Sequence, residues 1–400
     1  MKSLIQHPDF PAARQVCEKI QADKHTAWIA GGAVRDGLLG RQPKDIDIAT
    51  SATPDEVEKM FDKTVPLGKR FGTIQVHWCN VQFEVTTFRK DGGYQDGRHP
   101  EGVVFSGPQE DAERRDFTVN ALFYDPVLGR VYDFVGGEND LRQKILRAVG
   151  DPRLRFQEDH LRILRLYRFQ SQLGFQIAQE TQSAAEELFP LLKKISVERL
   201  WQEILKLSEG DYGDQFLSHQ LIPRILALWS GVTSVQNLSW DYPRVSWAFG
   251  FKLKYFVLEL LSSKDSGVDL QRLSEWFKLS NEERRSYELL LALQKSSSEE
   301  GEWLVRAIDF LASKDKFELY EGIFKALPYP RAQVQAQRLK EIFEQQGLSP
   351  LYKFADLPLG FPREKASEVL KKVHEKQLEL LIFEKEKLHP FFEMELKKYV

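Results

Sequence analysis

The stretch Lys44-Asp45-Ile46-Asp47-Ile48-Ala49-Thr50 alternates acidic and apolar residues. Alternate side chains of a β-strand share one face, so Asp45 and Asp47 are expected to point outward together while the isoleucines enter the core. Two strand rises would separate the Cα atoms of the aspartates by about 6.5 Å. Such a pair suits two divalent ions about 3.5–4 Å apart, and Mg²⁺ prefers carboxylates combined with substrate phosphates. The alternative is an ordinary solvated strand face, on which an Asp-x-Asp pair is common.

A β-hairpin is predicted further along the chain, on either side of Cys79-Asn80. The apolar residues that alternate with polar ones there are Ile74, Val76, Trp78, Val81, Phe83 and Val85. This alternation is typical of antiparallel strands with one buried face. Glu84 falls on the opposite face and could supply a third, catalytic carboxylate, although an exposed surface glutamate fits its position equally well.

Ahead of the acidic pair, Trp28-Ile29-Ala30-Gly31-Gly32-Ala33-Val34-Arg35-Asp36 has the pattern of a strand, a glycine turn and a helix start. Glycines allow backbone N–H groups to approach phosphate oxygens, and a helix N-terminus adds favourable partial charge. Arg35 could reach a triphosphate from this helix. A Gly-Gly pair alone is usually only a tight turn, but this one precedes the acidic pair by thirteen residues.

Length and composition restrict the class of protein. A chain of 400 residues with 42% hydrophobic and 29% charged residues predicts a soluble globular protein of two to four structural units. It has no eighteen-residue apolar run and no signal-peptide pattern, so a cytoplasmic location without membrane contact is expected. Cys17 and Cys79 lack metal-site spacing and are expected to be buried apolar side chains. The net charge of −3 requires any basic surface for RNA to be local.

Two compositional regimes are visible along the chain. Of the 25 glycines, 15 lie in the first 150 residues, together with the strand patterns, and Leu141–Val149 is expected to close this unit. Beyond Asp151 the apolar spacing becomes helical, with polar breaks at Ser262–Gly267 and Ser296–Gly301. The predicted helices are Phe156–Leu173, Glu180–Leu192, Val197–Leu207, Tyr255–Leu261, Glu282–Leu293, Glu302–Leu311, Arg331–Phe343 and Lys365–Leu388.

Several motifs together resemble one family. The combination of Gly31–Asp36, Leu38-Leu39-Gly40 and Asp45–Thr50 resembles the head motif of the polymerase-β superfamily branch that contains bacterial class II CCA-adding enzymes and poly(A) polymerases. The resemblance is strong over roughly residues 25–205 and weak beyond, with an echo at Leu359-Gly360-Phe361-Pro362. The further matching stretches are Thr86–Arg89 with Asp91–Pro100 (flexible loop), Arg114–Ala121 (ribose-sensing motif), Asp133–Leu141 (hinge), Glu158–Arg162 (base-reading motif) and Ser196–Arg199 (last neck motif).

The resemblance implies a fold and a division into domains. It implies an α+β head with a mixed β-sheet of the polymerase-β-like nucleotidyltransferase type, followed by an all-helical, elongated neck, body and tail. The expected domains are a catalytic head at 1–150, a base-recognising neck at 151–212, and tRNA-binding body and tail at 213–300 and 301–400. The glycine-rich polar run Arg89–Gly107 is expected to be mobile enough to shift between nucleotide choices, with a plain surface loop as the alternative. The resemblance implies that this loop permits addition of A, since relatives without it stop after CC.

Asp159 and Arg162 are three residues apart on a predicted helix and are expected to face one ligand. Cytosine and adenine each present an amino donor beside a ring-nitrogen acceptor, which a carboxylate and a guanidinium match. Uracil and guanine would place a carbonyl against the carboxylate and leave polar groups unpaired, at about 1–3 kcal/mol each. The resemblance implies the same role. The alternative is a surface salt bridge worth about 0.2–0.5 kcal/mol.

Arg162, Arg165 and Arg168 form a basic stripe at three-residue spacing, which could meet the triphosphate or the RNA backbone or could be a solvated helix face. By resemblance, Arg115 joins the nucleotide contacts. Asp116 and Asn120 orient the ribose or hold the motif together; the sequence does not separate these roles.

The expected activity is template-independent addition of CCA to the 3′ end of tRNA from CTP and ATP, with two Mg²⁺ ions and release of pyrophosphate. Asp45 and Asp47 are the expected metal ligands, and the helical half is expected to grip the acceptor arm and TΨC region of tRNA. The alternatives are an A-adding enzyme that completes CC ends, a poly(A) polymerase, or an inactive RNA-binding module. A monomer and a homodimer fit the sequence equally well.

Overall fold

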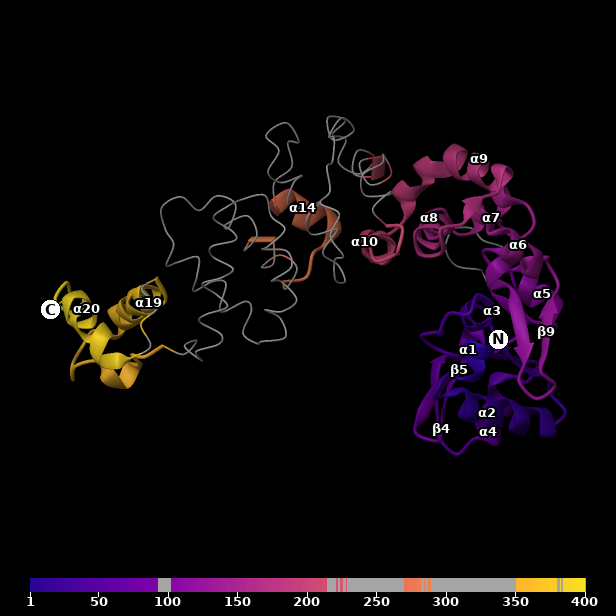
Figure 1. Cartoon of the computed structure of the whole chain (residues 1–400), viewed down its shortest axis with the longest axis horizontal. Helices are drawn as coiled ribbons and strands as arrows, with labels where there is room; N and C mark the ends of the chain where they lie inside the picture. Colours follow the sequence, from indigo (N-terminus) through magenta and orange to yellow (C-terminus); the bar gives the residue numbers. More distant parts are fainter. Residues whose placement is uncertain are drawn as a thin grey trace. The chain divides into compact units, whose positions relative to one another are not determined.

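The computed structural model divides the chain into two units, Met1–Phe216 and Leu217–Val400. Figure 1 shows the elements of the first unit in indigo to magenta and the described helices of the second unit in orange to yellow. The residues that the structure describes are 1–92, 102–213, 221, 224, 225, 228, 270–281, 284, 287, 288, 350–379, 382 and 384–399. The predicted helices Tyr255–Leu261, Glu302–Leu311 and Arg331–Phe343, most of Glu282–Leu293 and both predicted polar breaks lie outside them.

A seven-stranded sheet organises the first unit, in the spatial order β3-β4-β5-β2-β1-β8-β9. Its only parallel pair among these strands is β2 with β5, so the sheet is mixed, as predicted. The strands are β1 (Ala27–Ala30), β2 (Asp47–Thr50), β3 (Thr64–Gly68), β4 (Thr73–Trp78), β5 (Val81–Thr87), β8 (Leu122–Asp125) and β9 (Arg130–Asp133).

The predicted hairpin is confirmed as β4 and β5. Its turn residues Cys79 and Asn80 have φ of 49° and 62°, the positive angles of a two-residue turn that matches strand twist. Cys79 is exposed, and the prediction of a buried side chain is wrong for it, because its position at the tip of the turn leaves the side chain in contact with solvent. Cys17 is fully buried in the helix α2 (Phe10–Ala22), as predicted.

One face of the sheet is buried and the other is open near its centre. Ile74, Val76, Phe83 and Val85 are at most 1% exposed. The helices α2 and α4 (Pro54–Met60) contact this sheet, through β1 and β2 and through β4 and β5 respectively. On the opposite face the alternate residues, Glu84 among them, remain exposed or half-buried. The open face of the sheet is therefore a rigid surface on which polar side chains can meet a substrate.

Short elements precede, separate and follow the strands of this sheet. They are α1 (Lys2–Ile5), α3 (Gly32–Leu38), η1 (Lys69–Phe71), β6 (Arg89–Asp91), β7 (Val103–Phe105), α5 (Pro108–Glu113), η2 (Thr118–Asn120), α6 (Gly137–Gln143) and β10 (Ile145–Leu146). The strands β6 and β7 pair, so the predicted Arg89–Gly107 loop is in part a hairpin, and residues 93–101 lie outside the described part.

The helical half of the first unit consists of α7 (Pro152–Glu158), α8 (Leu161–Leu173), α9 (Gln179–Leu188), η3 (Phe189–Lys194) and α10 (Val197–Ser208). The prediction of one helix over Phe156–Leu173 is wrong, because the chain is extended at Asp159 (φ −137°, ψ 106°). The Asp159 carboxylate instead accepts the Leu161 N–H at the start of α8. The parallel strands β10 and β11 (Gln176–Ile177) join the two halves, and the expected head–neck boundary at residue 150 stays a prediction.

In the second unit, all described regular elements are helical, in agreement with the expected helical remainder. They are α14 (Leu270–Phe277), η5 (Phe354–Asp356), α19 (Arg363–Glu379) and α20 (Lys385–Leu396). The last two replace the single helix predicted over Lys365–Leu388, because the chain breaks before Lys385 and folds back so that Val369 and Val373 pack against Leu388 and Phe392. No helix in the described residues is long and apolar enough to cross a membrane.

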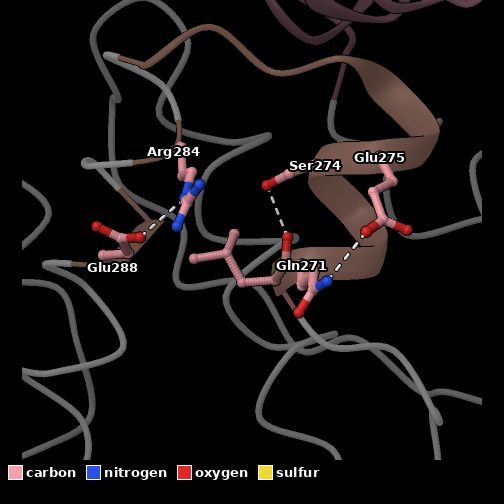
Figure 2. Close-up of a pocket in the computed structure, with 6 residues that line it drawn as sticks. Gln271, Ser274, Glu275, Arg284 and Glu288 are labelled. Atoms are coloured by element: carbon pink, nitrogen blue, oxygen red, sulfur yellow. Dashed lines mark hydrogen bonds and ion pairs between the residues drawn. The ribbon is translucent and has the colours of Figure 1, made fainter.

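A pocket in this unit is lined by Leu270, Gln271, Ser274, Glu275, Arg284 and Glu288 (Figure 2). Its polar side chains bond within their own helices, as in the 3.1 Å contact of Gln271 with Glu275 and the 2.9 Å contact of Arg284 with Glu288. None of the candidate site residues named from the sequence lines this pocket.

Candidate functional site

The acidic pair lies at the open centre of the sheet. Asp47 begins β2 and Asp45 precedes it, and both are exposed, whereas Ile46 and Ile48 are 6% and 1% exposed. Strand pairing sets Asp47 opposite Ala30, the residue before Gly31. The two carboxylates therefore share a face, and they lie beside the glycine bend.

Negative charge accumulates around Asp47. Because β2 runs parallel to β5 with Ile48 beside Val85, Glu84 lies on the same open face. Displacement of water by the surrounding protein, followed by the charges of Asp45 and Glu84, raises the pKa of Asp47 to about 6, although its side chain keeps an exposed edge and Arg115 acts in the opposite direction. A cation bound here would relieve this repulsion.

The donor set fits a hard divalent ion that also takes ligands from a substrate. In the described parts of the chain, no three His, Cys, Asp or Glu side chains gather as metal ligands, so Glu84 does not complete a protein cage with the aspartates. Two carboxylates with free coordination positions are what Mg²⁺ uses when phosphate oxygens and water supply the rest.

The glycine bend requires glycine at one of its two positions. Gly31 has φ 67° and ψ −125°, and its N–H donates to the Leu122 carbonyl at 2.9 Å. A Cβ on Gly31 would lie 3.0 Å from Nη1 of Arg115, whereas a Cβ on Gly32 would lie 3.7 Å from the nearest atom outside the helix backbone, Nη2 of Arg35. The bend thus lets the Arg115 guanidinium rest against the backbone beside Asp47.

This difference predicts unequal effects of two alanine substitutions. Gly31→Ala is expected to weaken nucleotide binding about tenfold and to lower the free energy of unfolding by about 1–2 kcal/mol, because it strains the backbone and displaces Arg115. Gly32→Ala, at a helical position with ordinary contacts, is the matched control and should change unfolding by less than about 0.5 kcal/mol. Equal losses of unfolding free energy in the two variants, measured by urea unfolding, would contradict this account, and titration calorimetry compares the binding of Gly31→Ala with that of the unmodified chain.

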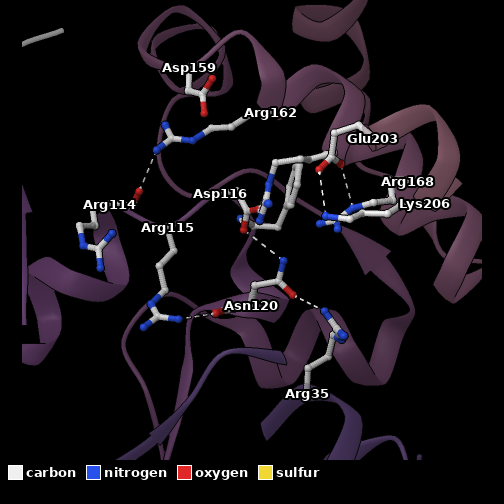
Figure 3. Close-up of polar contacts among 12 residues, drawn as sticks. Arg35, Arg114, Arg115, Asp116, Asn120, Asp159, Arg162, Arg168, Glu203 and Lys206 are labelled. Carbon is white, nitrogen blue, oxygen red and sulfur yellow. Dashed lines mark hydrogen bonds and ion pairs between the residues drawn. The ribbon is translucent and has the colours of Figure 1, made fainter. Parts of the chain in front are cut away.

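Arg35 is held firmly below the bend. Its side chain is 11% exposed, and its guanidinium donates to both carboxylate oxygens of Asp36, at 2.8 and 3.0 Å. It also donates to Oδ1 of Asn120 at 2.7 Å (Figure 3). It also lies 5.3 Å from the ring centroid of Phe169 on α8. Arg35 is therefore part of a rigid contact between the head sheet and the following helices.

Asp116 holds the neighbouring motif together. It accepts hydrogen bonds from the Phe117 N–H at 2.8 Å, Nδ2 of Asn120 at 3.1 Å and Nε of Arg165 at 2.8 Å. Burial opposes ionisation, but the charge of Arg165 and these hydrogen bonds lower the pKa of Asp116 to about 2. An uninterrupted chain of contacts thus runs from Arg35 through Asn120 and Asp116 to Arg165 (Figure 3).

The three arginines of α8 are not a free basic stripe. Arg162 pairs with Glu158 at 2.6 Å, Arg165 pairs with Asp116, and Arg168 pairs with Glu203 of α10 at 3.1 Å. Arg162 is buried and the other two are half-buried. Their charge is largely compensated inside the protein, because α8 packs between the segment at 111–120 and α10.

Asp159 lies in the break between α7 and α8, and Arg162 lies in the first turn of α8. Asp159 forms an ion pair of 3.2 Å with Arg199, the last residue of the Ser196–Arg199 motif. Arg162 donates to the carbonyl oxygens of Arg155 and Arg114, both at 3.1 Å, in addition to Glu158. The alternative of an i,i+3 salt bridge between Asp159 and Arg162 is therefore not realised, because each side chain has other partners, and the expectation that both face one ligand stays a prediction.

Sequence reasoning missed four residues around this site, namely Asp111, Glu158, Arg199 and Glu203. Two of them had a signal, since Glu158 precedes Arg162 by four residues and Asp111 precedes Arg115 by four, the spacing at which helical side chains meet. Arg199 lay within a quoted motif but was given no role. Glu203 gave no signal, because its partner lies on another helix.

Comparison with known proteins matches this geometry. Residues 27–147 match the model of the poly(A) polymerase head domain, and residues 174–219 match the model described as the probable RNA and SrmB-binding site of polymerase A. Over these two stretches the chain is similar to the tRNA nucleotidyltransferase and poly(A) polymerase family. The match to the head-domain model and the solved structure described below confirm the expected fold class, a polymerase-β-like head with a mixed sheet followed by a helical remainder.

Proteins of known name are similar to the same half of the chain. The CCA-adding enzymes of Staphylococcus saprophyticus and Bacillus pumilus are 45% and 48% identical over 204 residues, which is 51% of this chain and 51% of each relative. The matched region thus spans about half the length of these relatives. The crystal structure of the Bacillus stearothermophilus CCA-adding enzyme in complex with CTP is 27% identical, with a TM-score of 0.67 over 98% of this chain and 99% of that one.

A less similar protein shares the fold. The Thermotoga maritima CCA-adding enzyme complexed with tRNA is 19% identical, with a TM-score of 0.55 over 99% of this chain and 98% of that one.

Proposed function

We propose that this chain adds C and A nucleotides to the 3′ end of tRNA without a template, using CTP and ATP and releasing pyrophosphate. The observation that carries the proposal is the pairing of Ala30 with Asp47, which sets two outward carboxylates beside the Gly31 bend. The names of the similar proteins, one of them solved with CTP and another with tRNA, support the choice of substrates.

Asp45 and Asp47 are proposed to hold the metal ions, and Glu84 to add negative charge on the same face. When bound, two Mg²⁺ ions would favour attack of the RNA 3′-hydroxyl oxygen on the α-phosphorus and offset the charge of the departing pyrophosphate. A 3′-oxygen–phosphorus bond forms, and the bond between the α-phosphorus and the bridging oxygen breaks. The rigid sheet contributes by fixing both carboxylates against the bend.

Arginines on both sides of the bend are proposed to bind the triphosphate. The contacts of Arg115 to described residues use three of its five N–H donors, and its side chain is 20% exposed, so it can reach a phosphate oxygen. Arg35, held by Asn120, is proposed to add positive charge for the same triphosphate. The bend at Gly31 and Gly32 is proposed to bring backbone close to the ligand. The residues that surround these arginines are proposed to orient them for nucleotide binding, namely Asp116, Asn120, Arg165 and Arg168.

The incoming base is proposed to be read by Asp159 and Arg162. Asp159 would accept from the exocyclic amino group and Arg162 would donate to the ring nitrogen. In the structure Arg199 and Glu158 hold these side chains, and charged contacts of this kind keep them in fixed positions. A fixed pair discriminates by leaving the wrong base with unpaired polar groups. The tRNA acceptor arm and TΨC region are proposed to bind residues 213–400.

Product analysis tests the proposal. Labelled tRNAs that lack CCA, or that end in C or CC, are incubated with CTP, ATP or both in the presence of Mg²⁺, and the products are read at single-nucleotide resolution. The expected result is addition of all three nucleotides to the shortest tRNA when both nucleotides are present. Addition of a single A only to CC ends would indicate an A-adding enzyme, long A tails a poly(A) polymerase, and absence of incorporation an RNA-binding module.

A further inference from the structure

A buried carboxylate lies at the centre of the arginine contacts, outside the motif stretches quoted from the sequence. Asp111, on α5, is 1% exposed. Its Oδ1 accepts from Arg114 at 2.7–2.8 Å, and its Oδ2 accepts from Nε and Nη2 of Arg115 at 3.1 and 3.0 Å. Each oxygen thus contacts two nitrogens of one arginine, and these charge-assisted contacts hold both guanidinium groups against the same carboxylate.

Each of the two arginines continues to a different part of the site. Arg115 lies against Gly31, donates to the Asn120 carbonyl at 3.2 Å and sits 4.9 Å from the Phe123 ring centroid. The carbonyl of Arg114 accepts from Nη2 of Arg162, one of the two proposed base-reading residues, at 3.1 Å (Figure 3). One carboxylate therefore fixes both the proposed phosphate-binding arginine and the backbone that supports Arg162.

A third contact ties Asp111 to the hairpin that leads to residues 93–101. The N–H of Arg89, at the start of β6, donates to Oδ1 of Asp111 at 3.3 Å. The charges of Arg115 and Arg114 outweigh burial and lower the pKa of Asp111, so the carboxylate is ionised at neutral pH. Removing this charge would leave the guanidinium groups of Arg114 and Arg115 without their carboxylate partner in a largely buried environment.

From these contacts we propose that Asp111 is a positioning residue for nucleotide binding, which acts by orienting Arg115 toward the triphosphate. The inference rests on the proposed function, since it assumes that a nucleoside triphosphate binds beside Asp47. Because Arg115 would contact the triphosphate and not the base, Asp111 is expected to serve CTP and ATP equally.

The test compares Asp111→Asn with unmodified full-length chain by equilibrium binding of CTP and ATP and by steady-state kinetics. Asparagine keeps the shape of the side chain but not its charge. Binding of both nucleotides is expected to weaken about tenfold, the effect of losing roughly one hydrogen bond to a charged group, with a matching rise in KM and less change in kcat. Asp111→Glu, which restores the charge, should recover part of the affinity.

Asp125→Asn is the matched control. Asp125 is also a buried carboxylate, 3% exposed, but it accepts from the N–H groups of Val127 and Leu128 in a turn away from the proposed site. It is expected to change stability without changing nucleotide affinity. A loss of affinity in this control equal to that of Asp111→Asn would overturn the proposal, because any buried charge would then have the same effect.

A double-mutant cycle separates positioning from general loosening. In an Arg115→Ala background, Asp111→Asn is expected to weaken nucleotide binding less than about twofold further, since its target is gone. Full additivity, or unchanged affinity of Asp111→Asn itself, would overturn the role of Asp111. Failure of the unmodified chain to bind CTP and ATP would instead contradict the proposed function, so the two failures are distinguishable.

Discussion

Asp47→Asn is expected to reduce nucleotide incorporation by about a thousandfold or more, because an amide cannot replace a carboxylate as ligand to the proposed metal ions. The side-chain volume is nearly unchanged and Asp47 is exposed, so the fold should persist. Single-turnover incorporation on tRNA ending in CC measures the loss, and circular dichroism checks the fold. Appreciable activity of this variant would refute the metal-binding role of Asp47.

Asp47→Asn is also expected to affect stability, and in the opposite direction to its effect on activity. The pKa of Asp47 is raised to about 6 from its ordinary value of 3.8, so its ionised form is disfavoured in the folded, metal-free protein. That unfavourable contribution is absent below pH 3.8, grows between pH 3.8 and 6, and is complete above. At pH 7.5 without metal, Asp47→Asn is therefore expected to unfold at an equal or higher urea concentration than the unmodified chain. Asp62→Asn, at an exposed position outside the site, is the control for both readouts.

Glu203→Ala is expected to lower the free energy of unfolding by about 3–5 kcal/mol, because it leaves the Arg168 guanidinium buried without its carboxylate. The two side chains are 6% and 12% exposed, and their pair joins α10 to α8. Burial, followed by the nearby charge of Arg165, already lowers the pKa of Arg168 to about 10. Loss of Glu203 would remove the main compensating charge. Urea unfolding followed by tryptophan fluorescence gives the measurement.

A surface pair provides the comparison for Glu203. Arg153 and Glu187 also join two helices, at 2.9 Å, but are 53% and 54% exposed. Glu187→Ala is expected to cost less than about 1 kcal/mol, since solvent screens the pair and replaces its contacts. The double variant Arg168→Met with Glu203→Leu should regain much of the stability lost in Glu203→Ala, because apolar packing replaces a buried ion pair well. Equal costs at the two glutamates would show that burial does not set the strength of the Arg168 pair.

The sequence by itself determined the features that follow from local periodicity. Alternation over 45–48 placed two carboxylates on the open face, and alternation around Cys79-Asn80 gave the hairpin that presents Glu84 beside them. Gly31-Gly32 marked the bend, where a positive φ at the first position needs glycine. These properties depend on residues within one element, where side-chain direction is fixed by backbone geometry.

Only the tertiary structure decided which charges meet. Arg165 finds its partner Asp116 49 positions away, and Asp159 finds Arg199 40 positions away. The three-residue spacing on α8 was compatible with a free basic face, and the structure turns that face into ion pairs because neighbouring segments pack against it. No local pattern encodes such packing. It depends on how the buried faces of separate elements fit together. A charge that is buried there without a partner is costly in free energy, so the arginines of α8 meet carboxylates from neighbouring segments.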